Sequence, residues 1–231
     1  MLILILAEAA LETVPEDLWS HIAVKRHSKR RRKPPKFLIL NRSYHHSAMR
    51  NLKQSEKRGR PDIVHFTLLE ALGSPLNREG LLKAYVHTNN DFIVSVNSEA
   101  RLPRNCERFV GLLEQLFEKG KVPSRGQILL RLERKTLPEL LEEIRPDFVM
   151  AFSRKGKRNT LEKAATRLLS KEKPAVIIGG FPHGRFSKTT IRLADEVVSV
   201  DPQMLETWIL TSRVIYDYER GICLPKKRLK K

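Results

Sequence analysis

The chain contains little cysteine and no long apolar run. Its 231 residues include only Cys106 and Cys223, which lie far apart, so the sequence supports neither a disulfide framework nor a zinc site and suits a reducing cytoplasm. No apolar segment approaches the length that crosses a membrane. The opening MLILILAEAALETVP lacks a basic leader and soon includes Glu8 and Glu12, which indicates a buried first strand rather than a signal peptide.

Several familiar catalytic signatures are missing as well. The glycines of AVIIGGFPHGRF (175–186) are not followed by Gly-Lys-Ser/Thr, as a Walker A loop requires, and their spacing is not that of a dinucleotide-binding fingerprint. His45 and His46 have no third ligand at metal spacing, no Ser-His-Asp pattern occurs, and neither cysteine has an activating neighbour. We therefore expect no metal site and no nucleophilic hydrolase.

Positive charge, by contrast, is abundant. The net charge is +18, and much of it lies in KRHSKRRRKPPK (25–36) and KKRLKK (226–231), which are typical of solvated, mobile arms. Solubility or adaptation to heat explains mixed charge better than such a one-sided excess. The charge therefore favours a nucleic-acid partner, bound with strong salt dependence.

Apolar periodicity predicts strands that alternate with helices. We expect a hairpin over 83–97, helices over 61–72, 108–120, 137–144, 160–169 and 205–221, and strands over 2–6, 37–40, 128–132, 147–153, 175–180 and 196–200. This alternation predicts an α/β fold with a largely parallel sheet covered on both faces.

Three of the predicted strands end in residues suited to ligand binding. Ser153 follows DFVMAF, Gly179 and Gly180 follow AVII, and Asp201-Pro202 follows EVVSV. Ligands of parallel sheets bind outside the carboxyl ends of the strands. Because these loops carry few charges, they suit a neutral or cationic, nucleoside-like ligand held by backbone groups.

Two further clusters are candidates for a site. In GRPDI, Pro61 begins a helix and leaves Asp62 in its first turn, where a carboxylate is favoured whether it caps the helix or does chemistry. SPLNREG (74–80) is either a site wall or a connection. Arg101, Arg104 and Arg108 would share one face if a helix began there, and such a face either grips folded RNA or is merely solvated.

These segments in this order resemble the ribosome-biogenesis pseudouridine N1-methyltransferases of the SPOUT class, the α/β-knot methyltransferases. The resemblance runs from about residue 37 to 221 and rests on a series of motifs: GRPDI, SPLNREGLL, VHTNND, FIVSVN, RLPRNCERFVGLLEQL, IIGGFPHG and VVSVDPQMLETW. It implies a single SPOUT domain over 1–231 with a C-terminal trefoil knot, a basic insert at 25–36 and a basic tail at 222–231. It also implies a homodimer and favours an archaeal member.

The resemblance assigns roles to individual residues. It implies S-adenosylmethionine as cofactor, bound by nine residues: Ser153, Gly179, Gly184, Val200, Asp201, Pro202, Gln203, Met204 and Leu205. It implies that small-subunit ribosomal RNA contacts Arg60, Arg101, Arg104 and Arg108, with Asp62 at the target base. Glycine at 180, Asp201 and Gln203 depart from the family's usual residues, and His183 has no assigned role, although we expect a structural one before a catalytic one.

The implied reaction is methylation of N1 of a pseudouridine, in support of small-subunit ribosome biogenesis. An in-line methyl transfer depends chiefly on alignment, so Asp62 is expected to position the base first and to accept a proton second. Two alternatives stay open. One is a SPOUT enzyme for a ribose 2′-O or uridine N3 position, and the other is an RNA-binding assembly factor or chaperone without essential catalysis.

Overall fold

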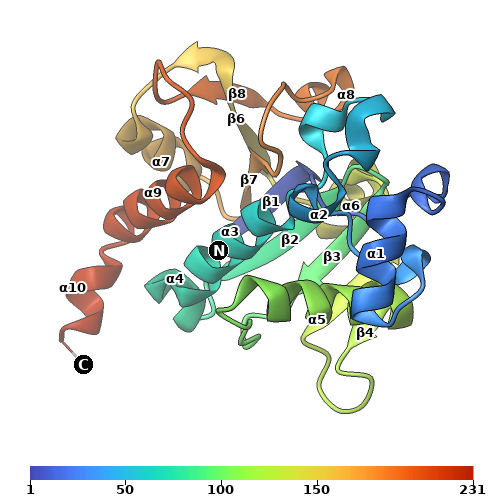
Figure 1. Cartoon of the computed structure of the whole chain (residues 1–231). Helices are drawn as coiled ribbons and strands as arrows, with labels where there is room; N and C mark the ends of the chain where they lie inside the picture. Colours follow the sequence, from blue (N-terminus) through green and yellow to red (C-terminus); the bar gives the residue numbers. More distant parts are fainter. Residues whose placement is uncertain (231) are drawn as a thin grey trace.

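The computed structural model describes residues 1–230, which contain one mixed eight-stranded sheet with helices on both faces (Figure 1). The strand order is β4-β5-β3-β2-β1-β7-β6-β8. The strands are β1 (Leu2–Ala9), β2 (Leu82–Thr88), β3 (Phe92–Val96), β4 (Lys121–Val122), β5 (Leu130–Arg134), β6 (Phe148–Arg158), β7 (Pro174–Gly179) and β8 (Glu196–Ser199). The five neighbouring strands β2-β1-β7-β6-β8 run parallel to one another. Strands β3, β5 and β4 continue the sheet beyond β2, and each is antiparallel to its neighbour.

Strand β1 lies in the interior of the sheet, and an apolar core covers it on each face of the sheet. Leu2, Leu4 and Leu6 join one core cluster, whereas Ile3 and Ile5 join the other, and all are buried. Successive side chains of a strand point to opposite faces, so a strand covered twice is apolar at every position. This explains the uninterrupted LILIL run and confirms the prediction of a buried first strand.

The helices form two layers around this strand. The first face is covered by α3 (Pro61–Gly73), α5 (Cys106–Lys119), α7 (Leu161–Leu169) and α9 (Thr207–Gly221), and the second by α6 (Leu137–Ile144). Shorter helices are α4 (Pro75–Arg78), α8 (Lys188–Arg192) and α10 (Leu224–Arg228). The predicted helices and the hairpin are all present, and several begin at a side-chain cap that the sequence contains, such as Asn105, Thr136 and Thr160.

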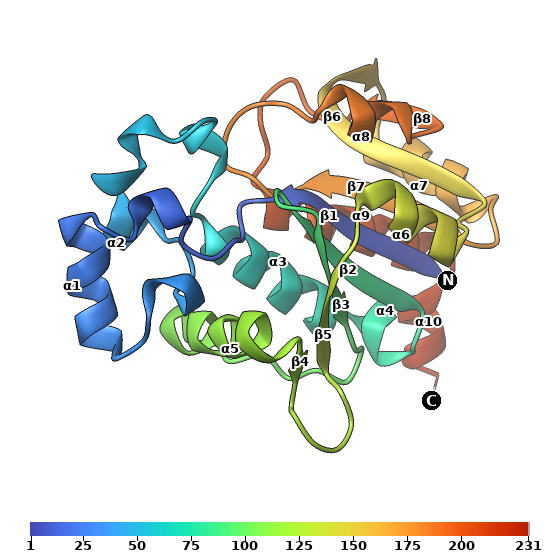
Figure 2. The same ribbon diagram turned by 90° about the vertical axis from the view of Figure 1, so that its right-hand side faces the viewer.

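A separate lobe is inserted between β1 and α3. We call residues 10–60 the N-terminal lobe; they form α1 (Ile22–Arg31), α2 (Arg42–His45) and four short 3₁₀ turns, Glu16–Leu18, Pro35–Phe37, Ala48–Asn51 and Ser55–Lys57. The lobe stands beyond one end of the sheet (Figure 2) and has a small core of its own. The strand predicted at 37–40 is wrong: Leu38 and Leu40 are buried in this core, and Ile39 forms only an isolated bridge with Thr13.

The described residues of the two basic runs lie largely in helices and turns rather than in extended arms. Lys25 to Arg31 lies in α1, where Val24 and His27 face the lobe core. Arg31 and Lys33 both pair with Oε2 of Glu114 in α5, at 2.8 and 3.1 Å, and the Glu114 side chain is fully buried. The physical reason for the difference is therefore a buried carboxylate, more than 80 positions away in sequence, that holds the insert in place.

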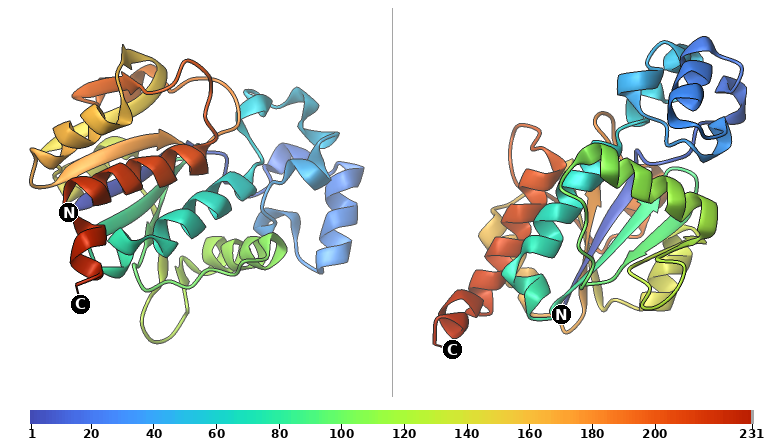
Figure 3. Two further views of the ribbon diagram at one scale, coloured as in Figure 1. Left: turned by 90° about the vertical axis from the view of Figure 1, so that its left-hand side faces the viewer. Right: turned by 60° about the horizontal axis from the view of Figure 1, so that its bottom comes forward.

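The second run lies at the opposite end of the molecule. Lys226, Lys227 and Arg228 belong to α10, which extends from the end of α9 (Figure 3). Arg228 pairs with Glu79 at 3.3 Å, and Lys231 lies outside the described residues. Along residues 1–230, no helix has both the length and the apolar character needed to cross a membrane.

Candidate active site

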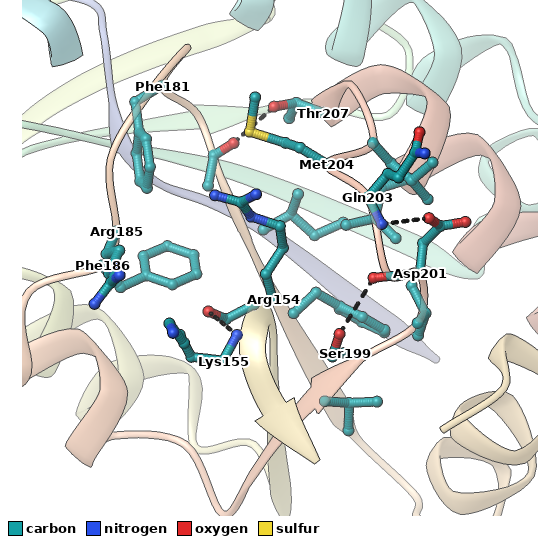
Figure 4. Close-up of a pocket in the computed structure, with 18 of the residues that line it drawn as sticks. Arg154, Lys155, Phe181, Arg185, Phe186, Ser199, Asp201, Gln203, Met204 and Thr207 are labelled. Atoms are coloured by element: carbon teal, nitrogen blue, oxygen red, sulfur yellow. Dashed lines mark hydrogen bonds between the residues drawn. The ribbon is translucent and has the colours of Figure 1, made fainter. Parts of the chain in front are cut away.

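One cavity of about 370 Å³ lies where β7 and β8 end and where the apolar part of β6 ends (Figure 4). Strand β6 does not stop at Ser153 as predicted but continues to Arg158, so its cavity residues lie within the strand. All nine residues that the resemblance assigns to the cofactor line it: Ser153, Gly179, Gly184, Val200, Asp201, Pro202, Gln203, Met204 and Leu205. Apolar side chains form its floor, among them Phe152, Ile178 and Val198. The parallel strand ends thus converge on a single site of the size and mixed polarity that suit a nucleoside-like ligand.

Hydrogen bonds hold the loops of this cavity in place. The Thr207 hydroxyl at the start of α9 donates to the carbonyl of Gly179 at 2.8 Å, which joins the ends of β7 and the 200–206 loop. Within that loop, the amide of Gln203 donates to Oδ1 of Asp201 at 2.8 Å. The Asp201 side chain therefore shapes the loop by holding the backbone amide two residues further on, which is an Asx-turn.

Two glycines are required by their surroundings. A Cβ on Gly180 would lie 2.8 Å from the Cα of Ala9, because the amide of Gly180 donates to Ala7 and its carbonyl accepts from Ala10. Gly184 has φ +102°, a backbone conformation that L side chains rarely adopt. The neighbouring His183 is exposed, and within residues 1–230 nothing gives it a structural partner.

A buried carboxylate fixes the far wall of the cavity, the 181–187 loop. Glu8, at a bulge in β1 with φ 51°, accepts from the amide of Ser187 at 2.7 Å and the hydroxyl of Thr190 at 2.8 Å. Its other oxygen pairs with Lys57 at 2.9 Å, and Lys57 also donates to the carbonyl of Arg185. Burial raises the pKa of Glu8, but the bonds from Ser187, Lys57 and Thr190 outweigh it and leave this pKa below its ordinary value.

The GRPDI segment forms a second cluster at the first turn of α3. The guanidinium of Arg60 donates to both carboxylate oxygens of Asp62, at 2.9 Å from Nε to Oδ1 and 2.7 Å from Nη2 to Oδ2. This bidentate pair raises the pKa of Arg60, to which the more distant charge of Glu206 also contributes. Glu206 follows the cavity residue Leu205, so the pair lies on the side of α3 that faces the start of α9.

The three remaining arginines do not share one helical face, because the condition for it, a helix that begins near Arg101, is not met. The helix begins only at Cys106, because Pro103 interrupts the pattern and the Asn105 side chain accepts from the amide of Arg108 at 3.1 Å. Arg101 and Arg104 therefore lie in the preceding loop, and all three arginines are exposed.

This loop is attached directly to α3. Nε2 of the buried His65 lies 2.6 Å from the carbonyl of Pro103, and its ring stacks on Phe109 with a centroid separation of 4.4 Å. His65 follows Asp62 by one helical turn, so one helix positions both Asp62 and the arginine-bearing loop.

The SPLNREG segment, by contrast, is a connection. Asn77 in α4 is buried and donates to the carbonyls of Leu72 and Ser98, at 3.0 and 2.9 Å. Neither it nor Arg78 lines the cavity.

A family model described as EMG1/NEP1 methyltransferase matches residues 4–219 of this sequence. The chain belongs to the EMG1/NEP1 methyltransferase family. It is 47% identical over 216 residues to the ribosomal RNA small subunit methyltransferase Nep1 of Pyrococcus furiosus, covering 94% of this chain and 95% of that protein. It is 45% identical over 224 residues to the protein of that name from Thermococcus kodakarensis, covering 97% of this chain and 100% of the relative.

A solved member of the EMG1/NEP1 family has the same fold. The crystal structure of Archaeoglobus fulgidus Nep1 bound to S-adenosylhomocysteine superimposes with a TM-score of 0.85 at 39% identity, over 95% of this chain and 98% of that one. The α/β fold that the sequence predicts is thereby confirmed, as is its membership of a methyltransferase family.

Sequence reasoning about this EMG1/NEP1 chain missed several residues of the cavity. Phe181 and Phe186 form one wall, and Arg154 and Lys155 directly follow Ser153 at the end of the apolar part of β6. Their adjacency to predicted residues was a usable signal. The sequence around Glu8 contains no signal of its role, because the partners of its carboxylate are separated from it by 49 or more positions.

Proposed function

We propose that this protein transfers a methyl group from S-adenosylmethionine to N1 of a pseudouridine in small-subunit ribosomal RNA, and so assists small-subunit biogenesis. The observation that carries the proposal is the nucleoside-sized cavity formed by β6 and the ends of β7 and β8, in a chain of this family that also has an Arg60–Asp62 pair and exposed arginines. The names of its relatives support methylation of small-subunit ribosomal RNA, and the S-adenosylhomocysteine bound to the Archaeoglobus protein supports S-adenosylmethionine as the methyl donor. We place the activity in the cytoplasm, consistent with two free thiols.

The residues of the cavity fit S-adenosylmethionine. Apolar side chains offer surface for an adenine and a thioether chain, and Gly179 and Gly184 contribute lining without side chains of their own. The nine lining residues predicted from the sequence would hold the cofactor, which when bound supplies an electrophilic methyl group on a sulfonium. The knotted path of the chain belongs to this proposal, and the insertion of β7 between β1 and β6 is consistent with it.

Asp62 is assigned to the target base. N1 of pseudouridine carries a proton that must leave around the methyl transfer, and a carboxylate can hydrogen-bond this edge and accept the proton. Arg60 holds both oxygens of Asp62, which fixes the direction of the carboxylate before the base arrives. Positioning is therefore its first task and proton acceptance its second.

Ribosomal RNA is assigned to Arg60, Arg101, Arg104 and Arg108 together with the N-terminal lobe. The three exposed arginines are suited to bind phosphates that flank a flipped or unpaired nucleotide. The lobe adds fourteen lysines and arginines against four acidic residues, and on α1 the side chains of Lys25, Arg26 and Lys29 are exposed. The positive surface therefore extends from the arginine loop to the lobe that packs against α5.

A homodimer is part of the proposal. Large apolar side chains of α3 and α9 are exposed on one chain: Phe66 by 43%, Ile209 by 40% and Tyr216 by 56%. Phe66 also packs edge-on against Trp208, with ring centroids 5.3 Å apart. An apolar patch of this kind favours association with a second copy, which would bury it close to the start of α9 and the cavity.

Mass spectrometry of small-subunit ribosomal RNA tests this function. The purified protein is incubated with isotopically labelled S-adenosylmethionine and small-subunit RNA that carries pseudouridine, and the fragments are then sequenced. We expect one labelled methyl group on N1 of a pseudouridine. Label on a ribose 2′-oxygen or a uridine N3 would refute the assignment, and tight RNA binding without methyl transfer would favour an assembly factor.

A further inference from the structure

The cavity carries an excess of positive charge that the proposed chemistry does not require. Arg154 and Lys155 within β6 and Arg185 in the 181–187 loop line it, whereas Asp201 is its one acidic lining residue. Asp201 already accepts from the amide of Gln203. A reaction that uses a cationic sulfonium gains nothing from cations near the transferred methyl group, so these side chains point to a different, negative part of the ligand.

Arg154 is the cation that reaches into this space. In Figure 4 its guanidinium extends between the Phe181 wall and the Met204 segment, whereas the Arg185 side chain points away from the cavity. Within residues 1–230 the Arg154 side chain forms no hydrogen bond, ion pair or ring contact. Its five donors are therefore available, and a guanidinium prefers a planar, two-oxygen anion.

We propose that Arg154 binds the methionine carboxylate of S-adenosylmethionine and S-adenosylhomocysteine. The inference rests on the proposed function, because it assumes that this cofactor occupies this cavity. The carboxylate is the ligand's only negative group, whereas its amine, and the sulfonium of the methyl donor, are positive. A bidentate pair with Arg154 would fix the amino-acid end beside β6, so the positive groups lie away from the cation.

The orientation has a consequence for the reaction. The amino-acid arm and the adenosine are joined through the sulfur, so anchoring the carboxylate removes rotational freedom from the sulfur and its methyl group. Arg154 is then a residue that binds the cofactor through its charged side chain rather than through backbone groups. Strand β6 places it there: Arg154 follows Ser153, just beyond the buried, apolar part of the strand.

The test compares two ligands that differ only in this carboxylate. Calorimetry measures the binding of S-adenosylhomocysteine and of its decarboxylated form, S-adenosyl-3-thiopropylamine, to the wild type, Arg154→Ala and Arg185→Ala. In the wild type we expect the decarboxylated ligand to bind about tenfold more weakly. Arg154→Ala should lose about tenfold with S-adenosylhomocysteine and little with the decarboxylated ligand, since the lost bond is the same one.

The outcomes separate this inference from the proposed function. Equal losses for both ligands in Arg154→Ala, or a carboxylate-selective loss in Arg185→Ala instead, overturn the assignment while the cavity remains the cofactor site. Unchanged binding of S-adenosylhomocysteine to Arg154→Ala together with weaker RNA binding overturns it in favour of a phosphate contact. A folded wild type that binds neither ligand refutes the proposed function itself. Circular dichroism confirms folding, which exposed side chains such as Arg154 should not affect.

Discussion

Two buried histidines should make the N-terminal lobe sensitive to mild acid. The amide of Asn41 donates to Nδ1 of His45 at 3.1 Å, so the proton of this neutral ring lies on Nε2 and is donated to Nδ1 of His27 at 2.9 Å. A second proton on His45 would lie on Nδ1 and face the amide of Asn41, and one on Nδ1 of His27 would face the proton on Nε2 of His45. Burial, followed by repulsion from His27, lowers the pKa of His45 to about 4 from 6.5, and burial and Arg30 lower that of His27.

The sign and size of the effect follow from proton linkage. Because the folded state holds His45 neutral, the stability is complete above pH 6.5 and is lost as the pH falls from 6.5 towards 4. The gap between these two pKa values corresponds to about 3 kcal/mol, of which about 2 kcal/mol is lost by about pH 5. His45 is fully buried, so solvent does not reduce this value, and His27 adds to it with the same sign.

Denaturant unfolding of the lobe measures this loss. Trp19, whose indole donates to the carbonyl of Val14 at 2.9 Å, reports on the lobe by fluorescence once Trp208 is replaced by phenylalanine. We expect the free energy of unfolding to fall by about 2 kcal/mol between about pH 6.5 and 5, before ordinary carboxylates titrate. His45→Asn can still accept from Asn41 and should flatten the profile, whereas exposed His46→Asn should not. A flat wild-type profile would refute the reasoning.

Three further predictions concern the site. Asp62→Asn should lower the methylation rate at least about 100-fold while S-adenosylhomocysteine affinity, measured by calorimetry, stays unchanged; wild-type turnover would exclude both roles of Asp62. Arg104→Ala should weaken RNA binding and reduce the salt dependence of log K by about 0.7 to 0.9, without altering cofactor affinity; loss of cofactor binding instead would contradict the proposed division. Glu8→Gln should destabilise the protein by about 2 kcal/mol in thermal unfolding and weaken cofactor binding, because the charge held by Lys57 is lost; unchanged cofactor affinity would show that the 181–187 loop does not need it. Glu8 itself contributes stability above about pH 4.5 that is lost as the pH falls through its lowered pKa.

The elements of the sheet could be predicted because their patterns are local. Strand β1 is apolar at each position since both its faces are covered, and α5 has its apolar stripe, its Asn105 cap and its Gly120 end within one segment. The cavity could be predicted from a general property of parallel sheets, which brings β6 and the ends of β7 and β8 together.

The errors occurred where distant residues decide the structure. The run 37–40 is as apolar as a strand, but Leu38 and Leu40 pack in the lobe core rather than the sheet, and periodicity cannot distinguish two cores. The helical docking of 25–31 depends on Glu114, and the clamp on the cavity loop depends on Glu8. The arginine loop is a different case, because Pro103 and Asn105 already argued against an early helix.

The N-terminal lobe and the loop that follows β7 are both attached through the backbone of Ala10. The amide of Arg60, where the lobe ends, donates to the carbonyl of Ala10, where it begins, at 3.0 Å, and the amide of Ala10 donates to Gly180 at 2.8 Å. The chain therefore leaves β1 and enters α3 at one point, so a change in the number of residues between Ala10 and Arg60 alters no strand register. The number of residues in the basic lobe is thus independent of the register of the sheet, whereas its point of attachment is fixed by these backbone bonds.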